Sequence, residues 1–102
     1  MAGEDPSYLA WVRTLPCSVP GCRAPSEAHH ITGAGMSLRS HDHDSMPLCR
    51  WHHGAFHDLT GHFKGWLKQR RREWQREEVA RVQALAAQRL EALGPLPDPD
   101  AF

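Results

Sequence analysis

The stretch PLCRWHHGAFH, residues 47–57, brings one cysteine and three histidines close together in the chain. The apolar residues before the cysteine favour a short β-strand over 45–49. The residues after it favour a helix from about 50 to 58, which Thr60 and Gly61 end. Histidine is the commonest protein ligand for metal ions. The stretch therefore predicts a strand that leads directly into a helix carrying metal-binding side chains.

The four metal-binding side chains of this stretch divide into two pairs. Cys49 and His52 are three residues apart and share one helix face, whereas His53 and His57 are four apart and share another. Successive residues are rotated by about 100°, so one helix can serve two sites on different sides. The rival division joins Cys49 to His53 and leaves His52 with His57, five residues apart, which fits one helix face less well. The first division is preferred.

A second cysteine pair lies earlier in the chain, at Cys17 and Cys22. Pro20 and Gly21 lie between the two thiols and predict a tight turn. Two such pairs can close a tetrahedral site of three thiolates and one imidazole, of the kind that structural zinc uses. The alternative is three buried thiols and an unrelated histidine. The expected zinc ligands are Cys17, Cys22, Cys49 and His52.

Two adjacent histidines, His29 and His30, occupy a predicted strand over 26–32. They are the expected partners of the second helix pair, which would otherwise be only part of a solvated helix face. Adjacent strand residues point to opposite faces, so both can reach one site only if the strand ends or bulges there. Gly33 makes such an ending plausible.

The rest of the chain is expected to frame this unit. Apolar spacing predicts a helix over 7–15 with Ser7 as its N-cap. A long helix should run from about 62 to 93, stopped by Gly94 and Pro95. The predicted organisation is a disordered leader at 1–7, a metal-binding domain at 8–62, a long basic and amphipathic helix at 63–93 and a frayed tail at 94–102. The fold class is therefore α+β.

The composition limits the class of protein. The chain has 102 residues, a net charge of +0 with neutral histidines, eight histidines and three cysteines. A chain of this length forms one small domain, and an odd number of cysteines argues against a disulfide framework. The sequence has no signal-peptide pattern and no apolar run long enough for a membrane span. We expect a cytoplasmic protein with no membrane partner.

Positive charge is concentrated between residues 64 and 76, where six basic residues face one acid. A basic helix can contact the DNA backbone without reading its sequence. The alternative is a solvated helix with Arg–Glu pairs, such as Glu77 with Arg81. Arg39 is a further candidate for a phosphate contact, although it could be an ordinary loop arginine. The candidate DNA-binding residues are Arg39, Lys64, Lys68, Arg70, Arg71 and Arg72.

The second half of this helix has an apolar stripe that could pack on the core or on another molecule. Self-association through this stripe would give a homodimer. The stripe contains Val79, Val82, Leu85, Ala86, Leu90 and Leu93.

The cysteine pair, the histidine doublet and PLCRWHH with a histidine four residues on resemble the HNH, or ββα-metal, nuclease superfamily in its zinc-knuckle form. The segments YLAWVRTLPC, AHHITGAG and an Arg39-x2-Asp42 step look like the phage RecA-dependent nuclease type of HNH protein. The match covers about residues 8–63. It implies a small ββα-metal core with a structural zinc knuckle, to which this chain adds a long C-terminal helix.

The resemblance also implies roles for individual residues. His29 would be a ligand of a catalytic divalent ion, completed by His53 and His57, and His30 would be the general base that activates water. The ion could be Mg²⁺, Mn²⁺, Ni²⁺ or Zn²⁺. The family's central asparagine has no counterpart, because the chain contains no Asn. Asp42 is expected in that place in preference to Asp44.

Three functions follow from these observations. The first is a metal-dependent endonuclease or nickase that hydrolyses DNA phosphodiester bonds in a bacterial or phage-infected cell. The second is a zinc-stabilised DNA-binding module without activity. The third is an adaptor whose long helix docks a recombinase filament or a phage packaging protein. Only the first gives a reason for His29, His30, His53 and His57.

Overall fold

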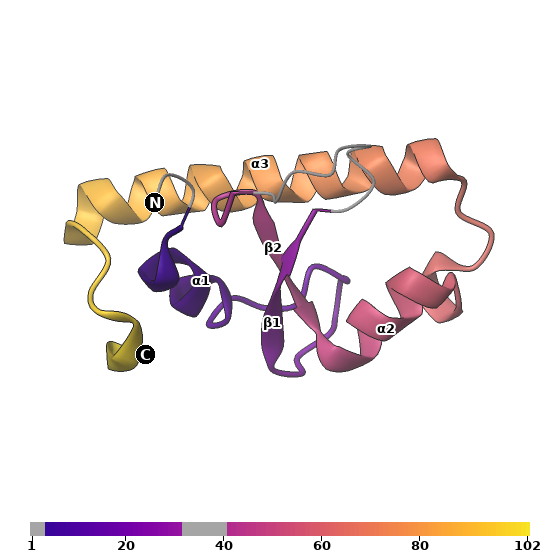
Figure 1. The fold of residues 1–102 in the computed structure, drawn as a ribbon, viewed down its shortest axis with the longest axis horizontal. Helices are drawn as coiled ribbons and strands as arrows, with labels where there is room; N and C mark the ends of the chain where they lie inside the picture. The colour runs from indigo at the N-terminus through magenta and orange to yellow at the C-terminus, as the bar shows by residue number, and fades with distance from the viewer. Residues whose placement is uncertain (1–3, 32–40) are drawn as a thin grey trace.

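The computed structural model describes residues 4–31 and 41–102. The hairpin and the shorter helices lie along one side of the long helix α3, which extends over the length of the molecule (Figure 1). The predicted α+β class is confirmed. In chain order the elements are α1 (Pro6–Val12), β1 (Ser26–His30), β2 (Ser45–Cys49), α2 (Arg50–Asp58), the 3-10 helix η1 (Gly61–Phe63), α3 (Lys68–Leu93) and the 3-10 helix η2 (Pro99–Ala101).

The two strands form an antiparallel pair with a regular register, in which His29 lies opposite Met46 and His30 opposite Ser45. Side chains directly opposite each other share a face of the sheet. Met46 belongs to the core beside α2, so His29 points to that side, whereas Ala28 packs on the α1 side. Strand β2 has the predicted bounds, and β1 ends at His30, earlier than predicted.

Helix α1 begins one residue before the predicted start. The N-cap is Asp5, whose Oδ1 accepts a hydrogen bond from the backbone N–H of Tyr8 at 3.1 Å. Ser7 is not the N-cap, as was predicted, because Pro6 already occupies the first helical turn, where its missing N–H has no cost. The expected leader of residues 1–7 is also too long, since residues 6 and 7 are helical and 1–3 lie outside the described residues.

Helix α2 spans 50–58, as predicted. Leu59 follows it with a left-handed φ of 54° and caps its C-terminus. The long helix does not begin near residue 62, because Gly65 takes a φ of 82° and Leu67 is extended. Residues 61–63 form η1 instead, and this turn buries Phe63 completely. The apolar spacing of this region therefore reflects core packing and not a continuous helix.

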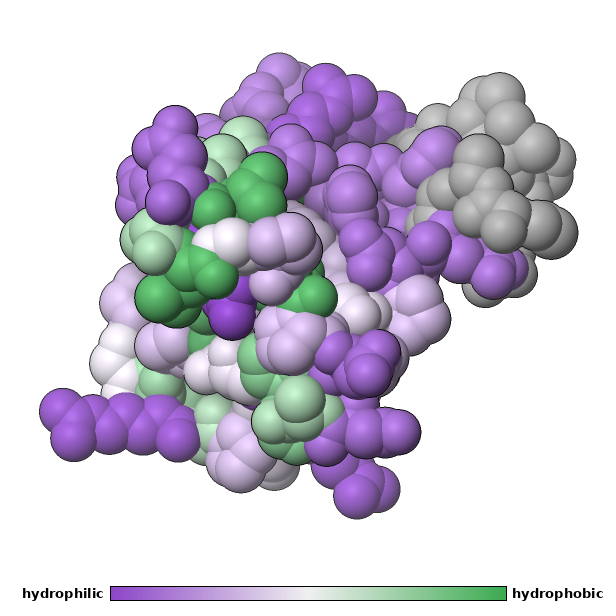
Figure 2. Space-filling model, turned by 90° about the vertical axis from the view of Figure 1, so that its left-hand side faces the viewer, coloured by the Kyte–Doolittle hydropathy of each residue, from purple (hydrophilic) through white to green (hydrophobic). Residues whose placement is uncertain are grey.

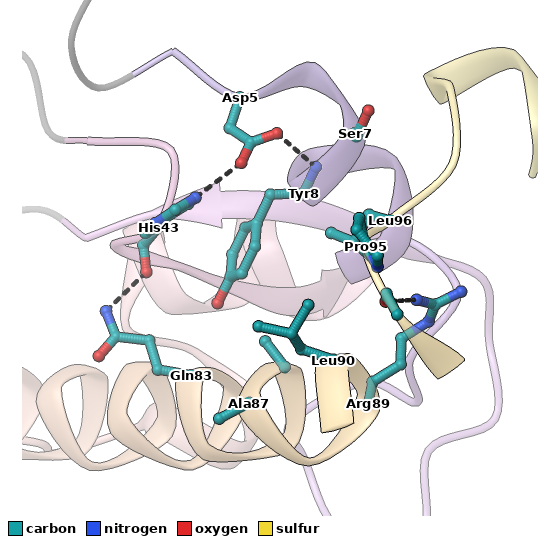
Figure 3. A pocket seen from close by; sticks show the side chains of 12 residues that line it. Asp5, Ser7, Tyr8, His43, Gln83, Ala87, Arg89, Leu90, Pro95 and Leu96 are labelled. Carbon is teal, nitrogen blue, oxygen red and sulfur yellow. Dashed lines mark hydrogen bonds and ion pairs between the residues drawn. The ribbon is translucent and has the colours of Figure 1, made fainter. Parts of the chain in front are cut away.

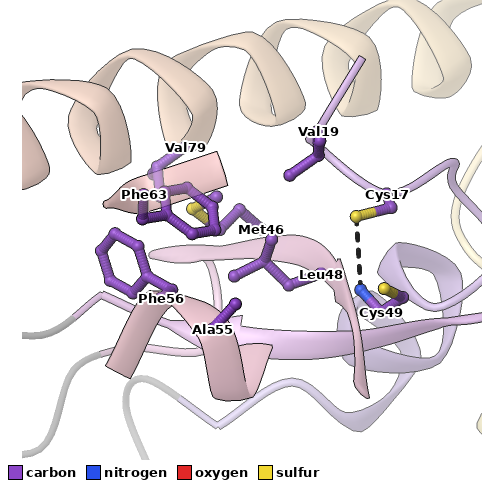
Figure 4. Close-up of a cluster of buried hydrophobic side chains, with 9 residues drawn as sticks. All are labelled: Cys17, Val19, Met46, Leu48, Cys49, Ala55, Phe56, Phe63 and Val79. Atoms are coloured by element: carbon purple, nitrogen blue, oxygen red, sulfur yellow. Dashed lines mark hydrogen bonds between the residues drawn. The ribbon is translucent and has the colours of Figure 1, made fainter. Parts of the chain in front are cut away.

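The main hydrophobic core lies between the sheet, α2, η1 and α3 (Figure 4). Two of the expected zinc ligands, Cys17 and Cys49, are part of it, so the metal-binding group adjoins the apolar core. Aromatic rings pack at its far end, where Phe63 contacts both Phe56 and Trp74 at centroid distances of 5.1 Å. The buried members are Cys17, Val19, Met46, Leu48, Cys49, Ala55, Phe56, Phe63 and Val79.

A second cluster joins α1 to the distal half of α3. Its buried members are Tyr8, Trp11, Val12 and Val82. The tail after Gly94 turns back toward α1 (Figure 1), and Leu96 packs on this cluster. Within the predicted tail, Leu96 is therefore partly buried, while most of the other residues are exposed. Among the described residues, no helix combines the length and hydropathy needed to cross a membrane.

Candidate metal centres

Three cysteines and one histidine come together where the turn between Cys17 and Cys22 meets the start of α2. One ligand atom from each of Cys17, Cys22, Cys49 and His52 lies within 4.8 Å of all the others. Gly21 takes a φ of 82° in the turn between the first two cysteines, a conformation that favours glycine. Cys49 is the N-cap of α2, and its sulfur accepts from the backbone N–H of His52 at 3.3 Å.

The distances within this group fit a tetrahedral ion. Zn–S bonds of about 2.3 Å and Zn–N bonds of about 2.0 Å would separate two sulfurs by about 3.8 Å, and a sulfur from a nitrogen by about 3.5 Å. The sulfurs of Cys22 and Cys49 are 3.7 Å apart. Nδ1 of His52 lies 3.5 Å from the Cys17 sulfur and 3.3 Å from that of Cys49. The group could therefore hold a metal ion such as zinc.

The surroundings shift the pKa values of Cys17 and Cys22 in opposite directions. Burial raises the pKa of Cys17 to about 11. Cys22 is more exposed, and a hydrogen bond with the backbone of Ala24 lowers its pKa. All three cysteines are free thiols in the structure. Since a metal takes the thiolate form, binding here must displace protons.

Three histidines form a second group on the other side of α2. Ligand nitrogens of His29, His53 and His57 all lie within 4.8 Å of one another. Nδ1 of His29 is 3.0 Å from Nε2 of His53, close to the separation of about 3.0–3.3 Å expected for two nitrogens bound to one ion. His29 is buried and His57 is exposed. This group could also hold a metal ion, and it is closed on one side and open on the other.

Two polar side chains support this group from behind. His29 Nε2 lies 2.9 Å from Oε1 of Gln75, which reaches across from α3. His53 Nδ1 lies 3.0 Å from a carboxylate oxygen of Glu27. Metal-binding histidines commonly donate their second ring N–H to such an oxygen. The arrangement therefore matches that of a supported metal site.

Burial chiefly lowers the pKa of His29 to about 4, and the charges of His53 and His57 lower it further, while the Gln75 hydrogen bond opposes this shift. His29 is therefore neutral at neutral pH. A neutral imidazole has a free lone pair, which is the form that binds a metal.

The neighbouring histidine has separate partners. His30 Nε2 lies 2.9 Å from Oδ1 of Asp42, and Oδ2 of the same carboxylate accepts the backbone N–H of Asp5 at 2.7 Å. Regular pairing continues to the end of β1, so the side chains of His29 and His30 lie on opposite faces of the sheet. Asp44 makes a different contact: its backbone oxygen accepts from the N–H of Ile31. Of the two candidate aspartates, Asp42 is the one that contacts His30.

The basic residues have mixed surroundings. Lys64, Lys68 and Arg70 are exposed, and the Arg70 guanidinium stacks 4.4 Å above the Trp66 ring. Arg71 and Arg72 are half-buried. Arg39 lies outside the described residues. Further along the helix, Arg81 pairs with Glu78 at 2.8 Å, where a pair with Glu77 was expected.

Most of the apolar stripe on α3 is used within the chain. Val79 and Val82 are buried, and Leu85 packs on the α1 cluster. Leu90 and Leu93 are 56% and 73% exposed. Figure 2 views the molecule from this end and shows hydrophobic side chains gathered beside hydrophilic ones. A dimer through α3 would thus have mainly its last turns available.

A cavity of about 600 Å³ opens at the same end (Figure 3). Its lining includes Tyr8, His43, Arg89 and Leu96. The Tyr8 and His43 rings pack at 4.4 Å, and Asp5 bonds His43 at 2.8 Å. None of the side chains of either metal-binding group lines this cavity, so it is separate from both.

Three supporting residues were not found from the sequence. Glu27 could have been, because it lies two positions before His29 and so shares its strand face. Gln75 had no sequence signal, being one polar residue among many on α3. Asp5 was missed because the leader was expected to be disordered.

Comparison with known proteins identifies a family. The profile described as "Protein of unknown function (DUF968)" matches residues 1–82. The chain is 40% identical over 60 residues to "Uncharacterized protein YdfU" of Escherichia coli (strain K12), a match that covers 56% of this chain and 17% of that protein. The chain thus spans a small part of this curated relative. No solved structure matches. Since the profile matches residues 1–82 of a chain of 102, the chain belongs to the DUF968 family.

Proposed function

We propose that this chain is a metal-dependent endonuclease of the HNH, or ββα-metal, type that hydrolyses phosphodiester bonds in DNA. One observation carries the proposal: β1 and α2 hold three histidine ligands together while the next strand residue, His30, is paired with a carboxylate. A closed structural site needs none of these four histidines. An open group of ligands is the arrangement expected for metal-assisted hydrolysis, and His30, which leaves β1 on the face opposite His29, is the candidate base.

The bound divalent ion would neutralise charge on the phosphate and on the leaving oxygen. His29, His53 and His57 would hold this ion, and the exposed side of the group would be left for substrate. Asp42 accepts the Nε2 proton of His30 and so leaves Nδ1 of that ring as the acceptor. The His30 side chain is 39% exposed, so a water molecule can reach it and lose its proton there.

The basic start of α3 supplies the expected contact with the DNA backbone. Arg71 and Arg72 lie four and three residues before Gln75, so they share its helix face. Because Gln75 contacts His29, this face adjoins the histidine group. The remaining basic residues, Lys64, Lys68 and Arg70, would add binding that does not depend on sequence.

The second candidate is a zinc-stabilised DNA-binding or adaptor domain without activity, which could serve a recombinase filament or a phage packaging protein. The Cys3His group and the basic helix are enough for it. This candidate differs in one respect: changing His30 would leave its function intact, while shortening α3 would remove it.

Plasmid cleavage across Mg²⁺, Mn²⁺, Ni²⁺ and Zn²⁺, combined with elemental analysis of the purified protein, tests the proposal. His30→Ala should lower the cleavage rate by about 10²–10⁴-fold, the usual contribution of a general base, and keep both zinc content and fold. His62→Ala is the matched control, because His62 is exposed and outside both groups. Full cleavage by His30→Ala would exclude the assigned base, and no cleavage by the unaltered protein with any ion would favour the binding domain.

A further inference from the structure

A buried amide connects the long helix to the histidine group. Gln75 is 2% exposed, although its neighbours in α3 are mostly polar and solvated. Its Oε1 lies 2.9 Å from Nε2 of His29, which is itself 2% exposed. Burying a polar side chain is costly unless it is hydrogen-bonded. The contact therefore gives Gln75 a specific partner, His29, in the histidine group. The resemblance covers only residues 8–63 and so places this group outside the long helix.

The oxygens of Gln75 and Glu27 determine which nitrogen carries the proton in the rings of His29 and His53. An amide oxygen only accepts, so His29 must donate its Nε2–H to Gln75, which leaves a lone pair on Nδ1. A carboxylate also only accepts, so His53 must donate its Nδ1–H to Glu27, which leaves a lone pair on Nε2. The two nitrogens that carry these lone pairs, Nδ1 of His29 and Nε2 of His53, are 3.0 Å apart.

Two lone pairs at this distance repel each other unless a cation lies between them. A shared proton would satisfy them by making one ring an imidazolium. A divalent ion would satisfy both nitrogens at once, together with His57 in the same group. Supporting oxygens that fix the ring tautomer are typical of metal-binding histidines.

We infer that Gln75 and Glu27 are positioning residues that impose opposite tautomers on His29 and His53, so that a divalent ion is bound through Nδ1 of the first and Nε2 of the second. Through Gln75, α3 is then part of the metal centre. The inference rests on the metal-binding part of the proposed function and not on DNA cleavage.

The test is metal affinity of the full chain. The Cys3His group is first filled with one equivalent of Zn²⁺, and the histidine group is then titrated with Co²⁺ by calorimetry and visible absorption. Thiolate charge-transfer bands would reveal any Co²⁺ that entered the cysteine group instead. Gln75→Leu should weaken Co²⁺ binding by about 10–100-fold, the usual effect of losing such a supporting partner.

Two further variants separate positioning from general stability. Glu27→Gln keeps an accepting oxygen and should retain most of the affinity, whereas Glu27→Ala should lose about tenfold or more. The Glu27 side chain is 50% exposed, so these variants should fold even if Gln75→Leu does not. The matched control is Gln83→Leu, because Gln83 is an exposed glutamine on the same helix that bonds the backbone oxygen of His43. It should bind Co²⁺ as the unaltered chain does.

Long-range ¹H–¹⁵N NMR of histidine-labelled protein, with Zn²⁺ in both groups, reads the tautomers directly. The expected result is metal on Nδ1 of His29 and on Nε2 of His53. Binding through the opposite nitrogens, unchanged affinity in both Gln75→Leu and Glu27→Ala, or no metal binding at the histidine group would each overturn the inference. If the metal binds as expected and DNA is still not cleaved, the nuclease proposal fails and the inference stands.

Discussion

Replacing Asp42 by asparagine should switch His30 to the wrong tautomer while changing the fold very little. Asp42 uses Oδ1 for His30 at 2.9 Å and Oδ2 for the N–H of Asp5 at 2.7 Å. An asparagine has one oxygen and one NH₂ group, and the N–H of Asp5 requires the oxygen. The NH₂ group then faces Nε2 of His30, which must become the acceptor and move its proton to Nδ1.

The size of the effect follows from what is lost. The proposed base would carry a proton on the nitrogen that should accept one, so its whole contribution of about 10²–10⁴-fold is removed. This corresponds to about 2.7–5.4 kcal/mol in the barrier, at about 1.36 kcal/mol for each factor of ten. Stability should change less, by about 1–2 kcal/mol, because the bond to Asp5 survives.

Single-turnover cleavage of a plasmid at saturating metal measures the rate, and thermal melting measures the stability. Asp44→Asn is the matched control, since the Asp44 carboxylate accepts from Gln83 at 3.5 Å and lies outside the His30 contact. A rate for Asp42→Asn within threefold of the unaltered chain would show that the tautomer of His30 does not matter. Equal losses in both variants would show that the effect is not specific to this pair.

Three further outcomes are expected. Cys49→Ser should lose zinc in elemental analysis and should be unfolded by circular dichroism. The reason is that a structural zinc site contributes about 10–16 kcal/mol, whereas a whole domain is stable by only about 5–15 kcal/mol. An unchanged melting curve would contradict a structural ion at this group. Zinc affinity, measured with a chromophoric chelator, should rise between pH 6 and 9, because burial raises the pKa of Cys17 to about 11 and its proton must leave; affinity independent of pH would argue that no thiolate forms. Replacing Arg71 and Arg72 together by alanine should reduce the salt slope of DNA binding by about 1.8, at about 0.9 for each phosphate contact, while the same change at the exposed Arg13 should leave the slope unaltered.

The elements next to the metal-binding side chains could be predicted from the sequence. Strand β2 and helix α2 have the predicted bounds, because ligand spacing and the residues that end the helix are local signals. The division of α2 into one face with Cys49 and His52 and another with His53 and His57 also follows from helix geometry alone, and the structure forms these two groups.

Features that depend on distant partners could not be predicted in this way. Leu96 is apolar, but whether it packs depends on where α1 lies. The buried position of Gln75 depends on the placement of α3 across the sheet. The sequence does not distinguish this glutamine from the other polar residues of the helix. Phe63 and Trp66 have helical spacing, yet Gly65 between them adopts a positive φ and prevents the helix.

Helix α2 contributes ligands to both groups from one stretch of nine residues. The orientation of α2 therefore affects both groups. An ion held by Cys49 and His52 would restrict the positions that His53 and His57 can adopt. The entropy of ordering the helix would be lost when the first ion binds and would not have to be lost again. The two groups should consequently fill in sequence, the sulfur-rich one first, and a protein stripped of zinc should have a weaker second site even with every histidine in place.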